Sequence, residues 1–293
     1  MKSQLKYNSG KWLLKILGPN RYLQLKYLYR TGKKLDLANP KRFTEKLQYL
    51  KLHDRRHIYT QYADKISVKQ EVEKLIGKEY IIPTLKVLSD SDQLMAENLP
   101  EQPIIVKTNH DSGNARVIVD KSQYDFSELA IHINKKLKRN FYYGNLEWEY
   151  KKIPPKILIE PLMSDGSGNE LLNDYKFHCF HGKPLFVQTI QDRSEGVKET
   201  WYNADWEYKE MWYYAAEHKI INRPDKLKEM LDLAEQLAQP FPYVRIDLYA
   251  TPDQVYFGEC TFRPYGGFMQ WNEEKWDYLL GNLIDLNRIE KYS

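Results

Sequence analysis

The chain contains the stretch Phe241-Pro-Tyr-Val-Arg-Ile-Asp-Leu-Tyr249 and, after a short turn, Tyr256-Phe-Gly-Glu-Cys-Thr261. Apolar and polar residues alternate in the first stretch, which is typical of a strand with one buried face. The turn Thr251-Pro-Asp253 between the two stretches predicts an antiparallel hairpin. Because successive side chains of a strand point to opposite faces, we expect Arg245 and Asp247 on one face and the intervening apolar side chains in the core.

Pairing of these two strands predicts a cluster of carboxylates. Glu259 and Thr261 share one face of the second strand, and antiparallel pairing would bring them close to Asp247, with Arg245 beside them. Two converging carboxylates are costly unless a cation neutralises them. Hard oxygen ligands suit Mg²⁺, which takes its other ligands from phosphates and water. The hairpin alone is equally compatible with an Arg–Asp ion pair on a solvated strand.

An earlier segment has the pattern of a phosphate-binding hairpin. The apolar strand that begins at Ile104 ends at Lys107, and the polar turn 109–114 leads into a second β-rich run, 116–119. A lysine at the end of a strand can meet phosphates, and the turn can offer backbone N–H groups to an anion. An ordinary hairpin that ends in a lysine remains the alternative for this segment.

The other segments predict an α+β chain with antiparallel sheets. Helices are expected over much of 1–60 with a break at Gly18-Pro19, and over 64–76, 127–137 and 224–239. Strands are expected at 156–160, 175–180 and 185–188, the last two joined by a tight turn.

The order of these segments resembles the ATP-grasp superfamily, and in particular its teichuronopeptide biosynthesis (TupA-like) branch. The resemblance extends from about residue 42 to 283. Its motifs are Tyr62-Ala-Asp-Lys65, Val106-Lys-Thr-Asn-His-Asp-Ser-Gly113, Asp174-Tyr-Lys-Phe177, His181-Gly-Lys-Pro184, Phe241–Tyr249 and Phe257-Gly-Glu-Cys-Thr-Phe262 continuing to Gly267.

The resemblance implies an ATP-grasp fold, in which two α/β subdomains with antiparallel sheets clasp ATP. The expected division is a basic helical segment, 1–60, and a catalytic domain, 61–293. Within that domain, about 80–155 would form the small nucleotide-clasping subdomain and 156–293 the larger, metal-binding one.

The resemblance also implies roles for individual residues with ATP and Mg²⁺ as cofactors. Lys65 and Lys107 would grip the phosphates, while the hairpin with His110, Ser112 and Gly113 would close over the nucleotide. Glu160 and Leu162 would contact adenine through backbone atoms, and Asp174 and Lys176 would lie near the phosphates or ribose. The expected Mg²⁺ ligands are Asp247, Glu259 and Thr261. Arg245 and Arg263 would be catalytic residues beside the acyl phosphate.

The sequence departs from the superfamily pattern at three positions. The superfamily commonly has asparagine where Thr261 stands, and Arg263 and Tyr265 flank Pro264 where the branch usually has small residues. At Thr261 a hydroxyl or a water would have to replace an amide oxygen at the second metal, and Arg263 with Tyr265 predicts an altered acceptor pocket.

Charge is distributed unevenly along the chain. Residues 1–60 contain fifteen Lys and Arg but only three Asp and Glu, which gives this segment a charge of +12. The net charge of the whole chain is +4, so the remaining residues carry −8. A basic segment of this kind predicts an anionic partner such as membrane lipid, acidic glycan or nucleic acid. The two cysteines, and the absence of any run of about 20 apolar residues, favour a cytoplasmic protein without a membrane span.

These observations together predict an ATP-dependent carboxylate–amine ligase that forms an amide through an acyl phosphate. The substrates would be a small molecule or glycan with a carboxylate, such as a uronic-acid unit of a cell-surface polysaccharide, and an amine donor. We expect no nucleic-acid partner, and peripheral contact with an anionic membrane at its inner face is a further hypothesis. The alternatives are an ATP-grasp sugar kinase and a glycosyltransferase-like or non-catalytic glycan-binding protein.

Overall fold

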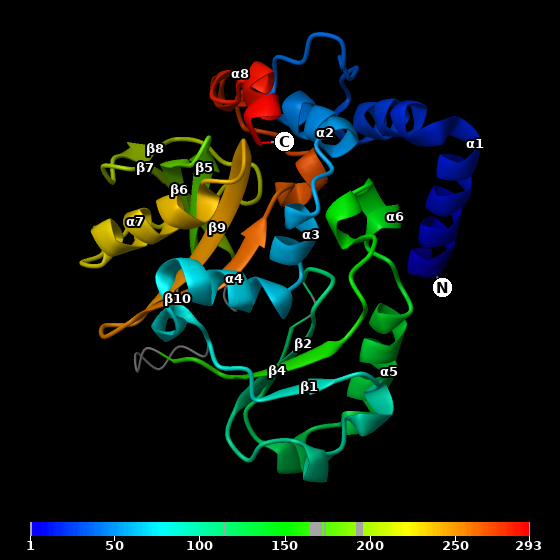
Figure 1. The fold of residues 1–293 in the computed structure, drawn as a ribbon, viewed down its shortest axis with the longest axis vertical. Coiled ribbons are helices and arrows are strands. Elements are labelled where there is room, and N and C mark those ends of the chain that lie inside the picture. The colour runs from blue at the N-terminus through cyan, green and yellow to red at the C-terminus, as the bar shows by residue number, and fades with distance from the viewer. Residues whose placement is uncertain (1, 114, 165–171, 173, 192–195, 293) are drawn as a thin grey trace.

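Two antiparallel sheets form the framework of the chain and lie in different parts of the molecule (Figure 1). The computed structural model describes residues 2–113, 115–164, 172, 174–191 and 196–292. Both sheets are antiparallel throughout their named strands, as the sequence predicts.

The larger sheet has six strands in the order β10-β9-β5-β6-β7-β8. One face packs against helix α7 (Leu227–Ala238), where Phe177, Ile246 and Leu237 are fully buried in the main core. The opposite face of the central strands therefore remains available for polar side chains. The strands are β5 (Asp174–Phe180), β6 (Lys183–Gln191), β7 (Lys198–Asn203), β8 (Tyr208–Lys209), β9 (Tyr243–Ala250) and β10 (Val255–Thr261).

The smaller sheet has four strands in the order β1-β4-β2-β3, and helix α5 (Phe126–Leu137) buries Leu129 and Ile133 against it. The strand that begins at Ile157 lies between β1 and β2 in this sheet. The division at 155/156, which assigned this strand to the larger subdomain, is therefore wrong, because the partners of the strand are the small-sheet strands. The strands are β1 (Lys86–Leu88), β2 (Ile104–Thr108), β3 (Arg116–Ile118) and β4 (Ile157–Pro161).

The N-terminal residues do not form a separate segment. Helix α2 (Phe43–His53) packs on helix α8 (Glu274–Asn282) at the other end of the chain, and Phe43 contacts Tyr243 of β9 at a centroid distance of 4.8 Å. The expected boundary at residue 60 therefore cuts through a hydrophobic core. Helix α1 (Lys2–Thr31) has the predicted break, since Gly18 takes φ +70° and Pro19 follows it.

Short helices connect these parts. Helices α3 (Ile58–Ala63) and α4 (Ser67–Ile76) lead from α2 towards the small sheet, and a single bridge between Ile81 and Phe257 links this connection to β10. Figure 1 shows α3 and α4 between the large sheet and the small one, and α4 packs against α7. The loop before α4 can therefore contact both sheets. Helix α6 (Tyr142–Asn145) lies next to α1.

Candidate active site

Polar side chains form two rows across β5, β9 and β10. The strand register aligns Lys176 with Asp247 and Asp247 with Glu259. Two residues away on each strand, the register aligns His178 with Arg245 and Arg245 with Thr261. Residues two apart on a strand share a face, so both rows lie on one face, opposite the core under α7.

A bulge in β10 adjusts the alignment of Glu259. The register shifts between Phe257 and Glu259, so Phe257 and Cys260 both reach the core while Glu259 pairs with Asp247. Gly258 makes this possible, since a Cβ there would lie 2.8 Å from the Tyr249 ring and 3.0 Å from the Asp247 carbonyl oxygen. Strict alternation in the sequence does not predict this bulge.

Arg245 and Lys176 neutralise the carboxylates of the first row. Arg245 donates from Nε to Asp247 Oδ1 at 2.6 Å and from Nη2 to Asp247 Oδ2 at 2.7 Å. The same Nη2 donates to Thr261 Oγ1 at 3.0 Å and lies 3.5 Å from Glu259 Oε1. Lys176 Nζ lies 2.7 Å from both Asp174 and Asp247. The four residues predicted to converge here, and Asp174 with Lys176, are therefore in one network.

The two acids at the centre of the network have opposite pKa shifts. Burial raises the pKa of Asp247 above its usual value, and Arg245 and Lys176 offset only part of this effect. Burial would also raise the pKa of Glu259, but Lys65 and Arg245 more than offset it and lower that pKa to about 2. Glu259 is therefore the more strongly ionised of the two.

Lys65 reaches the network from the loop between α3 and α4. Its Nζ lies 3.8 Å from Glu259 Oε2 and donates to the carbonyl oxygen of Asp111. Its backbone N–H donates to the carbonyl oxygen of Asn109, at the end of β2. Lys65 thus connects the turn after β2 with β10 of the large sheet.

Asn109, which the sequence analysis did not single out, holds this junction together. Its amide nitrogen donates to Asp64 Oδ1 at 2.8 Å and to the Pro154 carbonyl at 3.2 Å, and its Oδ1 accepts from the Lys156 N–H at 2.7 Å. Its signal in the sequence is its place in the motif 106–113, two residues after Lys107. We infer that it positions Lys65 relative to the small sheet.

Glu160 of β4 binds two lysines. Its carboxylate lies 2.5 Å from Lys107 Nζ and 2.6 Å from Lys69 Nζ, and it is almost fully buried. Its expected role involved only backbone atoms, so this side-chain pairing is an addition. Lys69 lies in the first turn of α4, whereas Lys65 precedes that helix, so helical spacing in the sequence does not identify this pairing.

The backbone N–H of Leu162, which was expected to contact adenine, already donates a hydrogen bond within the protein. The Leu162 N–H donates to the Pro103 carbonyl at 3.0 Å in this structure. Adenine could be contacted there only through another group or after that bond opens.

The turn after β2 lies at the junction of the two sheets. His110 is buried, with Nε2 3.1 Å from the Arg139 carbonyl, and Gly113 has φ +74°. Ser112 is also in this turn, whereas Asn114 lies outside the described residues. The predicted hairpin is present, since β2 and β3 pair on either side of the turn.

Arg263 does not join the network. It is fully buried, donates from Nη1 to the Phe262 carbonyl at 2.9 Å and lies over the Tyr59 ring at 5.5 Å. Its Nε and Nη2 have no hydrogen-bond partner within the described part of the chain. The expected catalytic role of Arg263 beside the acyl phosphate stays a prediction, and the structure places this side chain in the core beside Tyr59 of α3.

A cavity of about 380 Å³ opens over the network. Lys176, Arg245 and Gln188 form its polar part, and Tyr213, Tyr214 and Tyr265 form an aromatic wall. Tyr265 has φ +53°, an unusual value for a residue with a side chain.

The family model for TupA-like ATP-grasp proteins matches residues 45–285, close to the range expected from the motifs. The chain belongs to this ATP-grasp family. Its assignment to the TupA-like branch, its α+β ATP-grasp fold and its status as an ATP-grasp enzyme, all predicted from the sequence, are thereby confirmed.

Solved structures resemble this ATP-grasp chain more distantly. D-alanine–D-alanine ligase from Bacillus anthracis in complex with ATP is 16% identical, with a TM-score of 0.44 over 80% of this chain and 69% of that one. The same ligase from Helicobacter pylori is 15% identical, with a TM-score of 0.43 over 83% and 69% of the two chains. An ADP complex of PurK, an N5-carboxyaminoimidazole ribonucleotide synthetase, is 14% identical, with a TM-score of 0.45, and the match covers 75% of this chain but only 51% of PurK. No curated protein sequence matches the chain.

The acids of this ATP-grasp site suit a metal that phosphates help to bind. No group of three or more His, Cys, Asp or Glu side chains that could hold a metal occurs in the described ranges. Asp247 and Glu259 are two hard oxygen donors on paired strands, and Mg²⁺ commonly uses one or two carboxylates plus substrate phosphates. These two residues therefore fit Mg²⁺ in the presence of a nucleotide.

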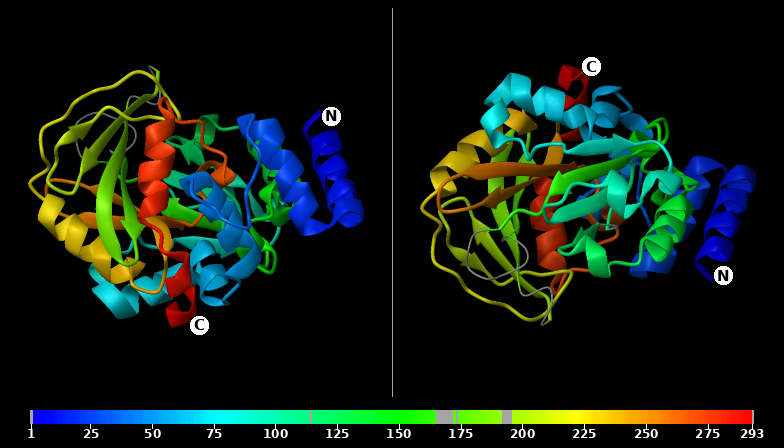
Figure 2. Two further views of the ribbon diagram at one scale, coloured as in Figure 1. Left: turned by 90° about the horizontal axis from the view of Figure 1, so that it is seen from above. Right: turned by 90° about the horizontal axis from the view of Figure 1, so that it is seen from below.

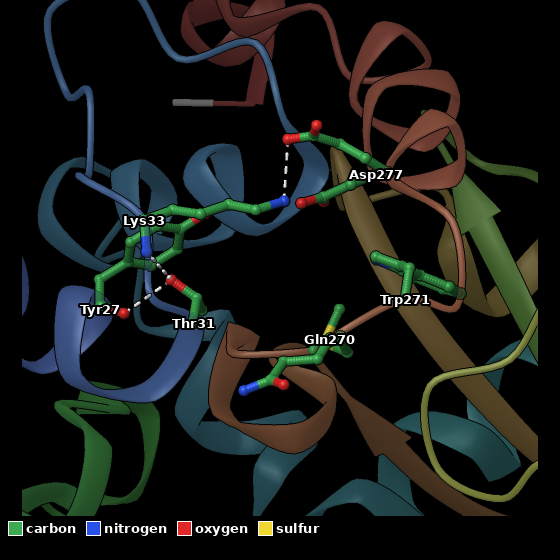
Figure 3. Close-up of a pocket in the computed structure, with 8 residues that line it drawn as sticks. Tyr27, Thr31, Lys33, Gln270, Trp271 and Asp277 are labelled. Carbon is green, nitrogen blue, oxygen red and sulfur yellow. Dashed lines mark hydrogen bonds and ion pairs between the residues drawn. The ribbon is translucent and has the colours of Figure 1, made fainter.

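A second cavity of about 200 Å³ lies between the end of α1 and α8 (Figure 3). At this cavity, Lys33 Nζ forms an ion pair with Glu274 Oε1 at 2.8 Å. The indole nitrogen of Trp271 points towards the cavity in Figure 3. The Trp271 ring also contacts Tyr213 at a centroid distance of 5.1 Å. The wall between the two cavities is therefore aromatic.

Proposed function

We propose that this ATP-grasp enzyme is a carboxylate–amine ligase that uses Mg-ATP. The substrate carboxylate attacks the γ-phosphorus of ATP, ADP leaves, and an acyl phosphate forms. The amine then attacks the acyl carbon, phosphate leaves, and an amide remains after the loss of a proton. Bound Mg²⁺ supplies charge neutralisation for the phosphates at Asp247 and Glu259.

The observation that carries this proposal is the placement of Arg245. Its guanidinium is held by Asp247, Glu259 and Thr261, and it lines the cavity. A fixed guanidinium can stabilise the negative charge that develops during acyl-phosphate formation without reorganising. Lys65 and Lys107, which both lower the pKa of Glu259, fit phosphate binding in the same site.

The cavity supports an acidic sugar as the carboxylate substrate. Lys176 and Arg245 offer positive charge, and the three tyrosines offer rings on which a sugar could stack. A uronic-acid unit combines a carboxylate with a ring of suitable size. We therefore propose a role in cell-surface polysaccharide biosynthesis, with ATP supplied in the cytoplasm.

A trapping experiment tests the reaction. Hydroxylamine should intercept the acyl phosphate and give a hydroxamate that becomes coloured with ferric ion. The product should require ATP, Mg²⁺ and an acidic sugar such as glucuronic or galacturonic acid. It should be absent with Asp247→Asn, whose fold is checked by circular dichroism.

The same assay separates the alternatives. A sugar kinase would yield an acid-stable phosphate ester and no hydroxamate. A glycan-binding protein would consume no ATP, and a glycosyltransferase would require a nucleotide sugar. Formation of ADP with a phosphorylated sugar across a panel of uronic acids would replace the ligase proposal with the kinase.

A further inference from the structure

The first half of α1 presents large apolar side chains to solvent. Trp12 is 64% exposed, Ile16 is 59% exposed, and Leu13 is also exposed. The spacing of Trp12 and Ile16 places them one above the other on one side of the helix, and Leu13 lies next to them. Single exposed apolar residues are common on proteins, but an exposed tryptophan, leucine and isoleucine within two turns form a patch.

The surroundings of this patch are basic. Residues 1–35 contain nine Lys and Arg and no Asp or Glu. Lys11 and Lys15 are exposed beside the patch, and no acidic partner for Lys15 or Arg21 occurs among the residues that the structure describes. The patch therefore combines apolar area with uncompensated positive charge.

The rest of α1 attaches this helix to the body of the protein. After the break at Gly18, Tyr22, Leu23 and Tyr27 are buried against a cluster that includes Phe268. Before the break, Lys11 Nζ lies 4.9 Å from the centre of the Tyr143 ring. Figures 1 and 2 place the first half of α1 at the outer edge of the molecule, away from both sheets. The exposed patch is thus held in place and remains accessible.

We propose that the surface formed by Lys11, Trp12, Leu13, Lys15 and Ile16 docks the protein onto an anionic phospholipid bilayer. Helices that lie in a membrane interface combine Lys and Arg with Trp and Leu in this way, and they bind through both apolar burial and attraction to anionic lipids. No helix in the described part of the chain is long and apolar enough to cross a membrane, so the contact is peripheral. An acidic glycan would match the lysines and could stack on Trp12, but it would leave Leu13 and Ile16 exposed.

Co-sedimentation of the full chain with vesicles tests this proposal. Binding is expected to vesicles of phosphatidylcholine mixed with phosphatidylglycerol, and to fall at least tenfold with phosphatidylcholine alone or in high salt, because salt screens the charges. Trp12→Ser/Ile16→Ser and Lys11→Gln/Lys15→Gln should each weaken binding about tenfold or more. Ile131→Ser on α5 is the matched control, since Ile131 is a 56% exposed isoleucine on another helix that contains lysines, and it should bind like the wild type.

A fluorescence measurement identifies the contacting residue. Lipids brominated near the interface should quench the tryptophan emission of the wild type and quench Trp12→Phe measurably less. Binding that is equal for the two lipid mixtures, or unchanged in both double variants, would overturn the proposal. A further outcome is that the protein sediments without vesicles and that Trp12→Ser/Ile16→Ser abolishes this sedimentation. This result would overturn the proposal and assign the patch to self-association. Hydroxamate formation with soluble sugars should be unchanged in these variants, so failure here is distinct from failure of the proposed reaction.

Discussion

Lys176 Nζ lies 2.7 Å from Asp247 Oδ2, on the neighbouring strand of the large sheet. Both side chains are buried, and Arg245 holds the other side of the same carboxylate. Asp247 therefore depends on two cations, one on its own strand and one on the adjacent strand. Loss of either cation therefore leaves the buried carboxylate only partly neutralised.

Lys176→Met should destabilise the protein by about 3 kcal/mol, because it leaves a buried carboxylate with incomplete neutralisation. Urea unfolding at neutral pH measures this change. The matched control is Lys183→Met on the adjacent strand, which removes an exposed ion pair with Glu235 and should cost less than about 1 kcal/mol. Equal stabilities of the two variants would show that Lys176 does not neutralise Asp247.

Lys65→Met and Lys107→Met should each weaken ATP binding about tenfold or more, since a charge-assisted phosphate contact contributes about 1.5–3 kcal/mol. Calorimetry with Mg-ATP measures the dissociation constants. Lys74→Met, at an exposed position at the end of α4, should leave ATP affinity unchanged. Wild-type affinity in either of the first two variants would remove that lysine from the nucleotide site.

Glu160 should contribute stability that depends on pH. Burial raises its pKa, but Lys107 and Lys69 more than offset this effect, so the folded pKa lies below 4.5. A carboxyl group with a lowered pKa stabilises the fold above its unfolded pKa and loses this contribution as pH falls through the folded value. Glu160→Gln should therefore cost about 1–3 kcal/mol at neutral pH, and the difference from the wild type should shrink below pH 4.5. A difference that is constant with pH in urea unfolding would contradict this reading.

Tyr265 combines a strained backbone with a side chain in the larger cavity. Because glycine adopts φ +53° without steric cost, Tyr265→Gly should be more stable than Tyr265→Ala by about 1 kcal/mol. Both variants remove the ring, so both should raise KM for the acidic sugar about tenfold if the ring stacks on it. Thermal unfolding and steady-state kinetics give the two readouts. An unchanged KM in both variants would separate Tyr265 from substrate binding.

Local periodicity was sufficient to predict the β9–β10 hairpin. The alternation in 243–250 placed Arg245 and Asp247 together and the apolar residues in the core, as the structure has them. Family membership followed from the order of short motifs, which is also a property of the chain alone. The binding roles of the site residues remain predictions.

Long-range packing decided what the sequence left open. The burial of Arg263 beside Tyr59 and the pairing of Glu160 with Lys69 and Lys107 each depend on contacts between segments far apart in the chain. The same holds for β4 in the small sheet and for α2 in the core. A strand alternates faces because of its own backbone geometry, so its sequence determined which side chains share a face. Which partners those side chains meet depends on how separate elements pack, and only the tertiary structure decided that.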